Sequence, residues 1–234
     1  MKKENNEDIN TLGDWYHSFK SLGIDNLQKG GIYPLNQVSK EGIILSYLRL
    51  AIEKTKASSK ENISVLDLFS ADCYYAFYAE KYGANIVHCV DSDKLALQQA
   101  KILINKWNIE DKIKIFAEDV FKFENAFEYD IVLCCGGLYH IYDPPELIKK
   151  IADKHKPNYL IIQTACSLNK LFDFAPYFES PAPGWTWGCR FNKSYLNDIL
   201  LKNNFSIVDF TFNELEGNER VEDRGSMYYL LKRK

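Results

Sequence analysis

The sequence has no apolar run long enough to cross a bilayer, which takes about 18 residues. Residues 1–10 are polar and of mixed charge, so the apolar core of a signal peptide is missing there as well. Basic residues are not in excess, because 29 Lys and Arg stand against 32 Asp and Glu, for a net charge of -3. These absences argue against a membrane partner, disfavour a long nucleic acid held by its phosphates, and lead us to expect a cytoplasmic protein.

The six cysteines have none of the close spacings of a metal site. They stand at positions 73, 89, 134, 135, 166 and 189, mostly in apolar runs, and none forms a C-x-x-C pair. Cys134 and Cys135 are adjacent, and neighbouring side chains of a strand point to opposite faces. We therefore expect buried, reduced thiols and no bound metal.

The chain also lacks internal repeats and low-complexity linkers, and its 234 residues suffice for a full core. We expect a catalytic domain over residues 59–234 and an N-terminal helical extension over residues 1–58. Within the extension, the spacing of apolar residues in 12–29 predicts a helix, glycines 30 and 31 open a loop, and 41–56 predicts a long amphipathic helix.

From residue 63 onward, strand and helix patterns alternate. The predicted strands are 63–68, 85–90, 113–116, 129–135, 159–164, 205–212 and 226–231, and the predicted helices are 73–82, 94–108, 144–155 and 194–203. This order indicates an α/β fold with a doubly wound, mostly parallel, seven-stranded sheet of Rossmann type, closed by an antiparallel C-terminal hairpin. Ligands of such sheets bind outside the carboxyl ends of the strands. Residues 165–191 are too long for an ordinary connection, which is typical of a functional loop.

The turn after the first strand, Phe69-Ser70-Ala71-Asp72-Cys73, contains no glycine. A dinucleotide fold needs Gly-x-Gly-x-x-Gly there so that the backbone can approach a pyrophosphate, and Asp72 would repel phosphates. The turn therefore argues against nicotinamide chemistry and favours a nucleoside without phosphates. S-adenosylmethionine is such a ligand, and carboxylates would attract its ammonium and sulfonium groups.

Acidic residues stand at the ends of three successive strands. Asp67 ends the first, Asp91 the second, and Asp119 follows the third. An acid at the end of the second strand is placed to accept hydrogen bonds from ribose hydroxyls. Each acid could instead cap the following helix, but three in register favour a nucleoside-bearing ligand.

Several segments resemble class I S-adenosylmethionine-dependent methyltransferases, namely 65–84, 91–92, 119 and 129–142. The motifs Trp15-Tyr16-His17-Ser18, Gly136-Gly137-Leu138-Tyr139-His140 and Trp185-Thr186-Trp187 resemble one branch in particular. That branch contains the tRNA wobble-uridine carboxymethyltransferase and many methyltransferases of small-molecule and glycan biosynthesis. The resemblance covers roughly residues 12–231.

The resemblance implies where the cofactor binds. The methionine part would lie along Asp67, Phe69, Ser70 and Asp72, the ribose at Asp91 with Ser92, the adenine at Asp119 and Val120, and the methyl group above Gly136. Many relatives have glycine where this chain has Phe69 and Cys73. From that departure we expect weaker cofactor binding rather than none.

Tyr139 and His140 follow the fourth strand, at the mouth over the methyl donor, and are the catalytic candidates. Histidine titrates near neutrality, so His140 is the candidate base for a hydroxyl acceptor. Much of the acceleration of methyl transfer can come from positioning, so His140 could also act by orienting the acceptor alone. A third interpretation is that it caps a loop.

Two further segments are candidates for binding the acceptor. Trp15, Tyr16 and His17 either pin the extension to the body or form a lid that presents Tyr16 or His17 to the acceptor. The second segment holds Trp185, Trp187 and Arg190. The tryptophans form either an apolar wall for a sugar face or base, or core filler, and Arg190 can hold a phosphate or carboxylate. Residues 222–224 are expected in a solvated loop.

The sequence thus predicts an S-adenosylmethionine-dependent methyltransferase that O-methylates a small polar acceptor such as a sugar or sugar conjugate. One alternative is a tRNA-modifying enzyme of the same branch, against which the net charge argues. Another is a non-catalytic nucleoside-binding module, which the glycine-free turn motivates. An acceptor cavity above Gly136 would favour the enzyme, and a basic stripe beside Trp185 would favour RNA.

Overall fold

The computed structural model describes residues 9–125, 127–183, 185–186 and 188–234. The helices are α1 (Tyr33–Ala57), α2 (Tyr74–Tyr82), α3 (Lys94–Trp107), α4 (Pro144–Lys150) and α5 (Lys193–Lys202). The strands of the main sheet are β1 (Ser64–Leu68), β2 (Ile86–Asp91), β3 (Ile113–Ala117), β4 (Ile131–Cys135), β5 (Tyr159–Ala165), β8 (Phe205–Glu214) and β9 (Gly225–Arg233). A short separate pair consists of β6 (Phe178–Glu179) and β7 (Arg190–Phe191).

The main sheet has seven strands in the order β3-β2-β1-β4-β5-β9-β8. The first five are parallel, and β9 runs antiparallel between β5 and β8. The predicted doubly wound sheet and its C-terminal hairpin are therefore confirmed. Since β1 lies between β2 and β4, the turns that follow these three strands meet at one edge of the sheet.

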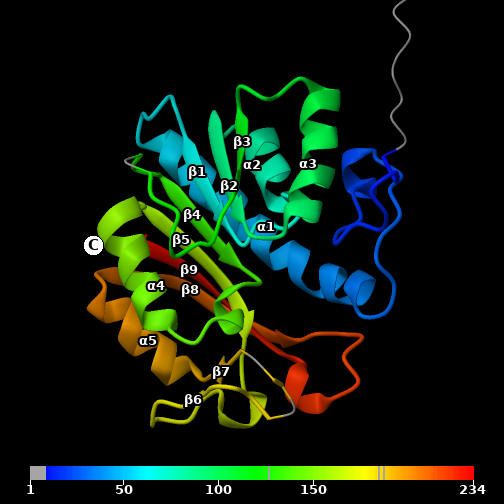
Figure 1. Ribbon diagram of the computed structural model, residues 1–234. Coiled ribbons are helices and arrows are strands. Elements are labelled where there is room, and N and C mark those ends of the chain that lie inside the picture. Colours follow the sequence, from blue (N-terminus) through cyan, green and yellow to red (C-terminus); the bar gives the residue numbers. More distant parts are fainter. Residues whose placement is uncertain (1–8, 126, 184, 187) are drawn as a thin grey trace, which may run out of the picture.

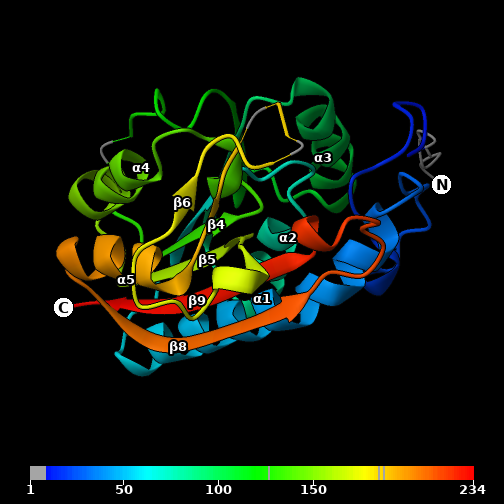
Figure 2. The ribbon, with the colours of Figure 1, turned by 90° about the horizontal axis from the view of Figure 1, so that it is seen from below.

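Helices cover both faces of the sheet, with α1, α2 and α3 on one side and α4 and α5 on the other (Figures 1 and 2). Every residue of β1 is buried, as expected of a central strand packed on both faces. Cys135 belongs to the core beneath α1–α3 and Cys134 to the core beneath α4 and α5. All six cysteines are buried with free thiols, as predicted.

The prediction of a helix over residues 12–29 is wrong. The segment holds one short 3-10 turn at Lys20–Leu22, and a parallel bridge joins Trp15 to Gln28. Side chains replace helical hydrogen bonds: Asn26 accepts from the Phe19 backbone N–H and donates to the His17 carbonyl. Trp15 and Phe19 are fully buried, so the apolar spacing reflects docking onto the body rather than a helical period.

Other element boundaries differ from the prediction for local reasons. Helix α1 begins at Tyr33 instead of residue 41, because Pro34 suits the first turn of a helix. Helix α4 ends at Lys150 and continues as a π-helical turn at Ile151–His155. Residues 165–191 are mostly irregular, as predicted, apart from the short β6–β7 pair. Within the described ranges, no helix has the length and apolar character needed to cross a membrane.

The amino ends of three strands are tied together by Asp130, a buried carboxylate. It accepts from the Ser64 backbone N–H at 2.9 Å and the Ser64 hydroxyl at 3.0 Å, both at the start of β1. Asn158, just before β5, donates to it at 3.2 Å, and Lys60 at 2.7 Å. This network fixes the edge of the sheet opposite the cavities described below.

We predict that Asp130→Ala lowers the free energy of unfolding by about 3 kcal/mol, because buried donors lose their acceptor. The matched control is Lys60→Ala: the Lys60 side chain is 48% exposed, so its loss should cost under about 1 kcal/mol. Urea denaturation followed by circular dichroism measures both. Equal losses for the two variants would contradict a central role of the carboxylate.

Candidate active site

Two adjoining cavities lie at the carboxyl ends of the strands. The first, of about 420 Å³, is lined by residues of the turn after β1, the ends of β2 and β3, and Gly136 after β4. The second, of about 550 Å³, lies between α1, the turn after β4, and the loop around Trp185. Both volumes suit a small-molecule ligand. The residues that line both cavities are Tyr16, His17, Lys40, His140 and Gln163.

The turn after β1 contains three non-glycine residues in the left-handed region, Phe69 (φ 61°), Ala71 (φ 45°) and Cys73 (φ 60°). Such a conformation costs about 1 kcal/mol or more for a residue with a Cβ. Hydrogen bonds to the end of β2 offset this strain. The N–H groups of Phe69 and Ala71 donate to the Val90 carbonyl and to Asp91 Oδ2, at 2.9 and 2.8 Å. Asp91 therefore fixes the turn and also lines the first cavity.

Phe69 and Cys73, the two departures from glycine, are accommodated differently. The Phe69 ring lies against Gly137, where an added Cβ would come within 1.9 Å of the ring. Gly137 thus leaves the room that this ring needs. The Cys73 side chain is fully buried in the core, with Sγ 3.8 Å from Ser70 Oγ, so its bulk lies away from the cavity.

Seven of the nine predicted cofactor residues line the first cavity: Phe69, Ser70, Asp91, Ser92, Asp119, Val120 and Gly136. Asp67 and Asp72 lie behind its wall, with 1% and 0% of their surface exposed. The pKa of Asp67 is raised well above its ordinary value, first by burial and then by the neighbouring charges of Asp91 and Asp72. Its Oδ2 has no hydrogen-bond partner among the described residues.

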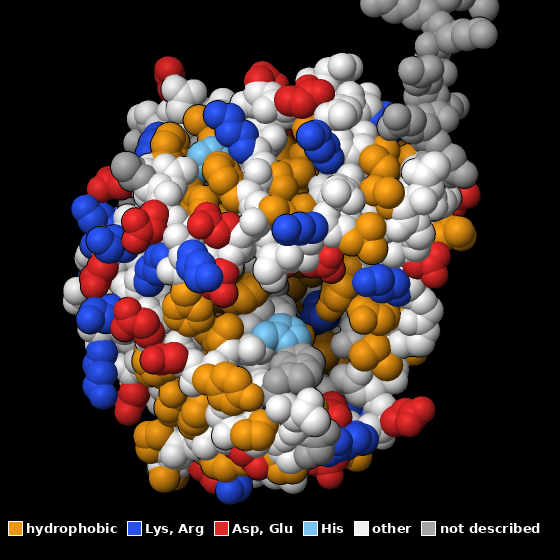
Figure 3. Space-filling model, viewed as in Figure 1, with side chains coloured by type: hydrophobic (Ala, Val, Ile, Leu, Met, Phe, Trp, Pro, Cys, Tyr) orange, Lys and Arg blue, Asp and Glu red, His pale blue; other side chains and the backbone are white. Residues whose placement is uncertain are grey.

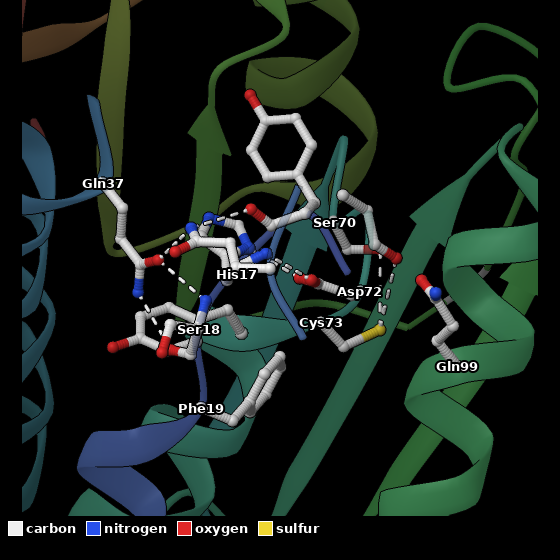
Figure 4. A network of polar contacts seen from close by, with 12 residues as sticks. His17, Ser18, Phe19, Gln37, Ser70, Asp72, Cys73 and Gln99 are labelled. Atoms are coloured by element: carbon white, nitrogen blue, oxygen red, sulfur yellow. Dashed lines mark hydrogen bonds and ion pairs between the residues drawn. The ribbon is translucent and has the colours of Figure 1, made fainter. Parts of the chain in front are cut away.

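Asp72 binds the N-terminal strap, as we name residues 9–29, which lies over the turn. The His17 backbone N–H donates to Asp72 Oδ2 at 2.7 Å, and His17 Nδ1 lies 2.6 Å from Asp72 Oδ1 (Figure 4). On α3, Gln99 donates to the carbonyls of Gly13 and Asp14 at 3.2 Å. The strap is therefore pinned to the body, and its Tyr16 and His17 also line both cavities.

The capping alternative for the strand-end acids holds in part. Asp119 Oδ1 accepts from the Phe121 backbone N–H at 2.7 Å, so Asp119 caps its own turn while it lines the cavity. The cap of α3 is Asp93, which accepts from the N–H groups of Leu95 and Ala96. Asp91 accepts from Asp93 N–H as well as from the turn.

His140 and Tyr139 lie in a 3-10 turn after β4, with ring centroids 4.1 Å apart. Desolvation at the cavity wall and the charge of Lys40 lower the pKa of His140 to about 4, so its imidazole is neutral at pH 7. Burial raises the pKa of Tyr139 to about 12, which keeps its hydroxyl protonated. Tyr139 lines the second cavity, and its ring lies 5.9 Å from that of Trp185.

The structure places Trp185 at the second cavity and Arg190 behind it. Arg190 is 3% exposed, stacks on the Trp185 ring at 4.8 Å and forms an ion pair with Asp223. Trp185 Nε1 donates to the same carboxylate at 2.8 Å. The expected solvated loop is therefore wrong for Asp223, because Arg190 and Trp185 draw its carboxylate into the cavity wall. Trp187 lies outside the described residues.

Two residues shared by the cavities, Lys40 and Gln163, were not among the sequence candidates. Gln163 is a polar residue that directly follows the apolar residues 160–162 of β5, which was a usable signal. Lys40 lies one helical turn before Ile44, on the buried side of α1. A lysine on such a face is a second signal of the same kind.

We predict that Gly137→Ala destabilises the fold by about 1 to 3 kcal/mol, because the new methyl group would overlap the Phe69 ring. The double variant Phe69→Ala, Gly137→Ala should recover part of this loss. Denaturation of the two single variants and the double variant measures the coupling. Strictly additive losses would show that the ring and the glycine do not share this space.

Comparison with known proteins gives the family. A family model described as a methyltransferase domain matches residues 43–209. No curated protein matches by sequence. Among solved structures, the magnesium protoporphyrin IX methyltransferase of Synechocystis PCC 6803 with bound SAH aligns at 16% identity and TM-score 0.65, covering 92% of each chain.

Other solved structures share this fold. The N-terminal domain of EvdMO1 with SAH bound has 16% identity and TM-score 0.64, covering 96% of this chain and 93% of that one. The N-methyltransferase NodS of Bradyrhizobium japonicum WM9 has 15% identity and TM-score 0.60, covering 83% and 87%. With the matched family model, the chain belongs to the methyltransferase-domain family and is a class I S-adenosylmethionine-dependent methyltransferase.

Proposed function

We propose that this methyltransferase acts on a hydroxyl group of a small polar molecule bound in the second cavity. The observation that carries the proposal is the wall shared by the two cavities, in which His140 and Gln163 face both. An acceptor in the second cavity would lie beside the cofactor cavity. Aromatic rings of Tyr139 and Trp185 and amides of Asn36 and Asn218 line it, a mixture that suits a sugar or sugar conjugate.

The first cavity suits S-adenosylmethionine, which supplies an electrophilic methyl group when bound. Carboxylates at its wall suit ribose hydroxyls and cationic groups, and we assign the ribose to Asp91 with Ser92 and the adenine to Asp119 with Val120. Phe69, Ser70 and Gly136 would line the remainder of the cofactor. Asp72 would act through the strap that it binds, and Asp67 from behind the wall.

His140 would position the acceptor and receive its proton. The neutral imidazole can accept a hydrogen bond from a hydroxyl at one ring nitrogen. A pKa of about 4 makes it a weak base, so the proton would move only as the hydroxyl oxygen begins to attack. Tyr139 and Trp185 would hold the acceptor in line, and Arg190 would fix the Trp185 ring.

Surface charge and one structural neighbour favour a small acceptor over tRNA. Around the hollow in Figure 3, the described basic and acidic side chains are interspersed, and they form no continuous basic stripe. The N-terminal domain of EvdMO1, which shares the fold, was solved in the presence of SAH and D-fucose. The resemblance to the wobble-uridine branch remains a prediction, with tRNA as the alternative acceptor.

The function is tested by release of S-adenosylhomocysteine from S-adenosylmethionine in the presence of sugars, sugar conjugates and bulk tRNA. We expect turnover with a hydroxyl-bearing small molecule, and a methyl ether in the product by mass spectrometry. Turnover with tRNA alone, suppressed by salt, would contradict the proposal.

For His140 we predict that the acid limb of the pH profile of kcat lies at a lower pH than an ordinary histidine would give. A pKa lowered below the ordinary value of about 6.5 keeps the neutral imidazole above about pH 5, so kcat should fall only as the pH approaches 4. His140→Ala should lower kcat by about a hundredfold or more and remove this limb. Binding of S-adenosylhomocysteine, measured by calorimetry, is the control. If the fall of kcat at low pH persists in His140→Ala, a group other than His140 causes it.

A further inference from the structure

Lys40 is a buried lysine for which the described residues provide no hydrogen-bond or ion-pair partner. It projects from α1, is 8% exposed, and lines both cavities. Within the described part of the chain, no hydrogen bond or ion pair to its ammonium group is present, although buried lysines are almost always paired. Leaving a charge unpaired in a wall costs free energy unless a ligand provides the counterion.

Several acidic residues of α1 and of the two cavities already accept hydrogen bonds or form ion pairs with other groups. Asp223, at the second cavity, pairs with Arg190. Glu41 accepts from Gln37 and from the hydroxyl of Tyr74. In the cofactor cavity, both Asp91 oxygens and one Asp119 oxygen accept backbone N–H groups.

The charge state of Lys40 follows from its surroundings. Burial lowers the pKa of Lys40 to about 8. At pH 7 the ammonium form still predominates, and it lowers the pKa of the neighbouring His140. The wall between the cavities therefore presents a positive charge that the described chain leaves uncompensated.

Helix α1 assigns this charge to the second cavity. Tyr33, Asn36, Gln37 and Lys40 form one face of the helix, at the spacing of residues that lie above one another, and all line that cavity. In the first cavity, the ammonium and sulfonium groups of the cofactor would repel Lys40, and the cofactor's single carboxylate already has its own ammonium group beside it. In Figure 3, a basic side chain lies inside the hollow, beside a histidine.

We propose that Lys40 binds an acid group of the acceptor, a carboxylate or a phosphate, and so selects hydroxyl-bearing anions such as sugar acids or sugar phosphates. The inference rests on the proposed function and narrows its acceptor class. The ion pair would form in a mostly desolvated wall, where charge–charge attraction is stronger than in water. It would anchor the acceptor at one end and leave a hydroxyl to face His140.

The first test requires no turnover. The pKa of Lys40 is followed by NMR on ¹³C-lysine-labelled protein loaded with S-adenosylhomocysteine, with its signal assigned by loss in Lys40→Arg. Excess inorganic phosphate or acetate should raise this pKa, with at least a tenfold increase in the proton affinity of the Lys40 amine. A neutral polyol such as glycerol should leave the pKa unchanged. A pKa that neither anion changes would overturn the proposal, whatever the outcome of the methylation screen.

The second test compares Lys40→Met with Lys40→Arg, which keeps the charge but cannot accept a proton at neutral pH. The two acceptors are an acid-bearing one, such as glucuronate, and a neutral one, such as glucose. Lys40→Met should raise KM at least tenfold for glucuronate alone, and Lys40→Arg should keep the wild-type KM for glucuronate. A loss of kcat in both variants at unchanged KM would make Lys40 a base and overturn the proposal. No turnover with either acceptor would count against the proposed function and leave the NMR result to decide the role of Lys40.

A third measurement separates the acceptor from the cofactor as the source of the anion. S-adenosylhomocysteine has an amino-acid carboxylate, and methylthioadenosine does not. The proposal expects Lys40→Met to leave both affinities within about threefold, since its charge belongs to the second cavity. A tenfold loss for S-adenosylhomocysteine alone would show that Lys40 serves the cofactor carboxylate.

Discussion

The turn after β1, held in a left-handed conformation without any glycine, is the constraint on which the site depends. Its N–H groups are bonded to the carboxyl end of β2, through the Val90 carbonyl and the Asp91 side chain. From the same turn, Phe69 packs against Gly137 after β4, and Asp72 binds His17 of the strap. The end of β2, the turn after β4 and the N-terminal segment are therefore positioned by five consecutive residues.

The strain of the left-handed turn is balanced by packing and hydrogen bonds. Each left-handed residue with a Cβ costs free energy on its own. The turn keeps this conformation because contacts with its surroundings offset the cost. The Cys73 side chain fills core space, the Phe69 ring fills the space above Gly137, and the Asp91 carboxylate satisfies backbone donors. A glycine at Phe69 or Cys73 would relieve the backbone strain but would also remove side-chain packing. The size of the side chain at position 69 therefore determines whether position 137 can carry a side chain.

The sequence predicted the sheet well, because the strand–helix alternation and the strand-end acids depend on local pattern. That Asp91 and Asp119 would lie together followed from topology, since parallel strands end at one edge, whereas Gly136 was added by the resemblance to methyltransferases. The strap was mistaken for a helix because residues docked on a core imitate an amphipathic spacing. Arg190 and Asp223 could not be placed from sequence, since their ion pair joins segments far apart in the chain. Lys40 was recognisable in the sequence as a cation on a buried helix face. Its proposed role in ligand binding depends on the two cavities that it lines, which only the structure shows.

Calorimetric titration of S-adenosylhomocysteine into the wild-type protein and an Asp91→Ala variant tests the central claim most directly. If the first cavity is the cofactor site, the wild type binds one equivalent. Asp91→Ala, confirmed as folded, should bind at least about tenfold more weakly, because it would lose the carboxylate that we assign to the ribose as well as the anchor of the turn. Equal affinity in the two proteins, or no binding by the folded wild type, would contradict the account.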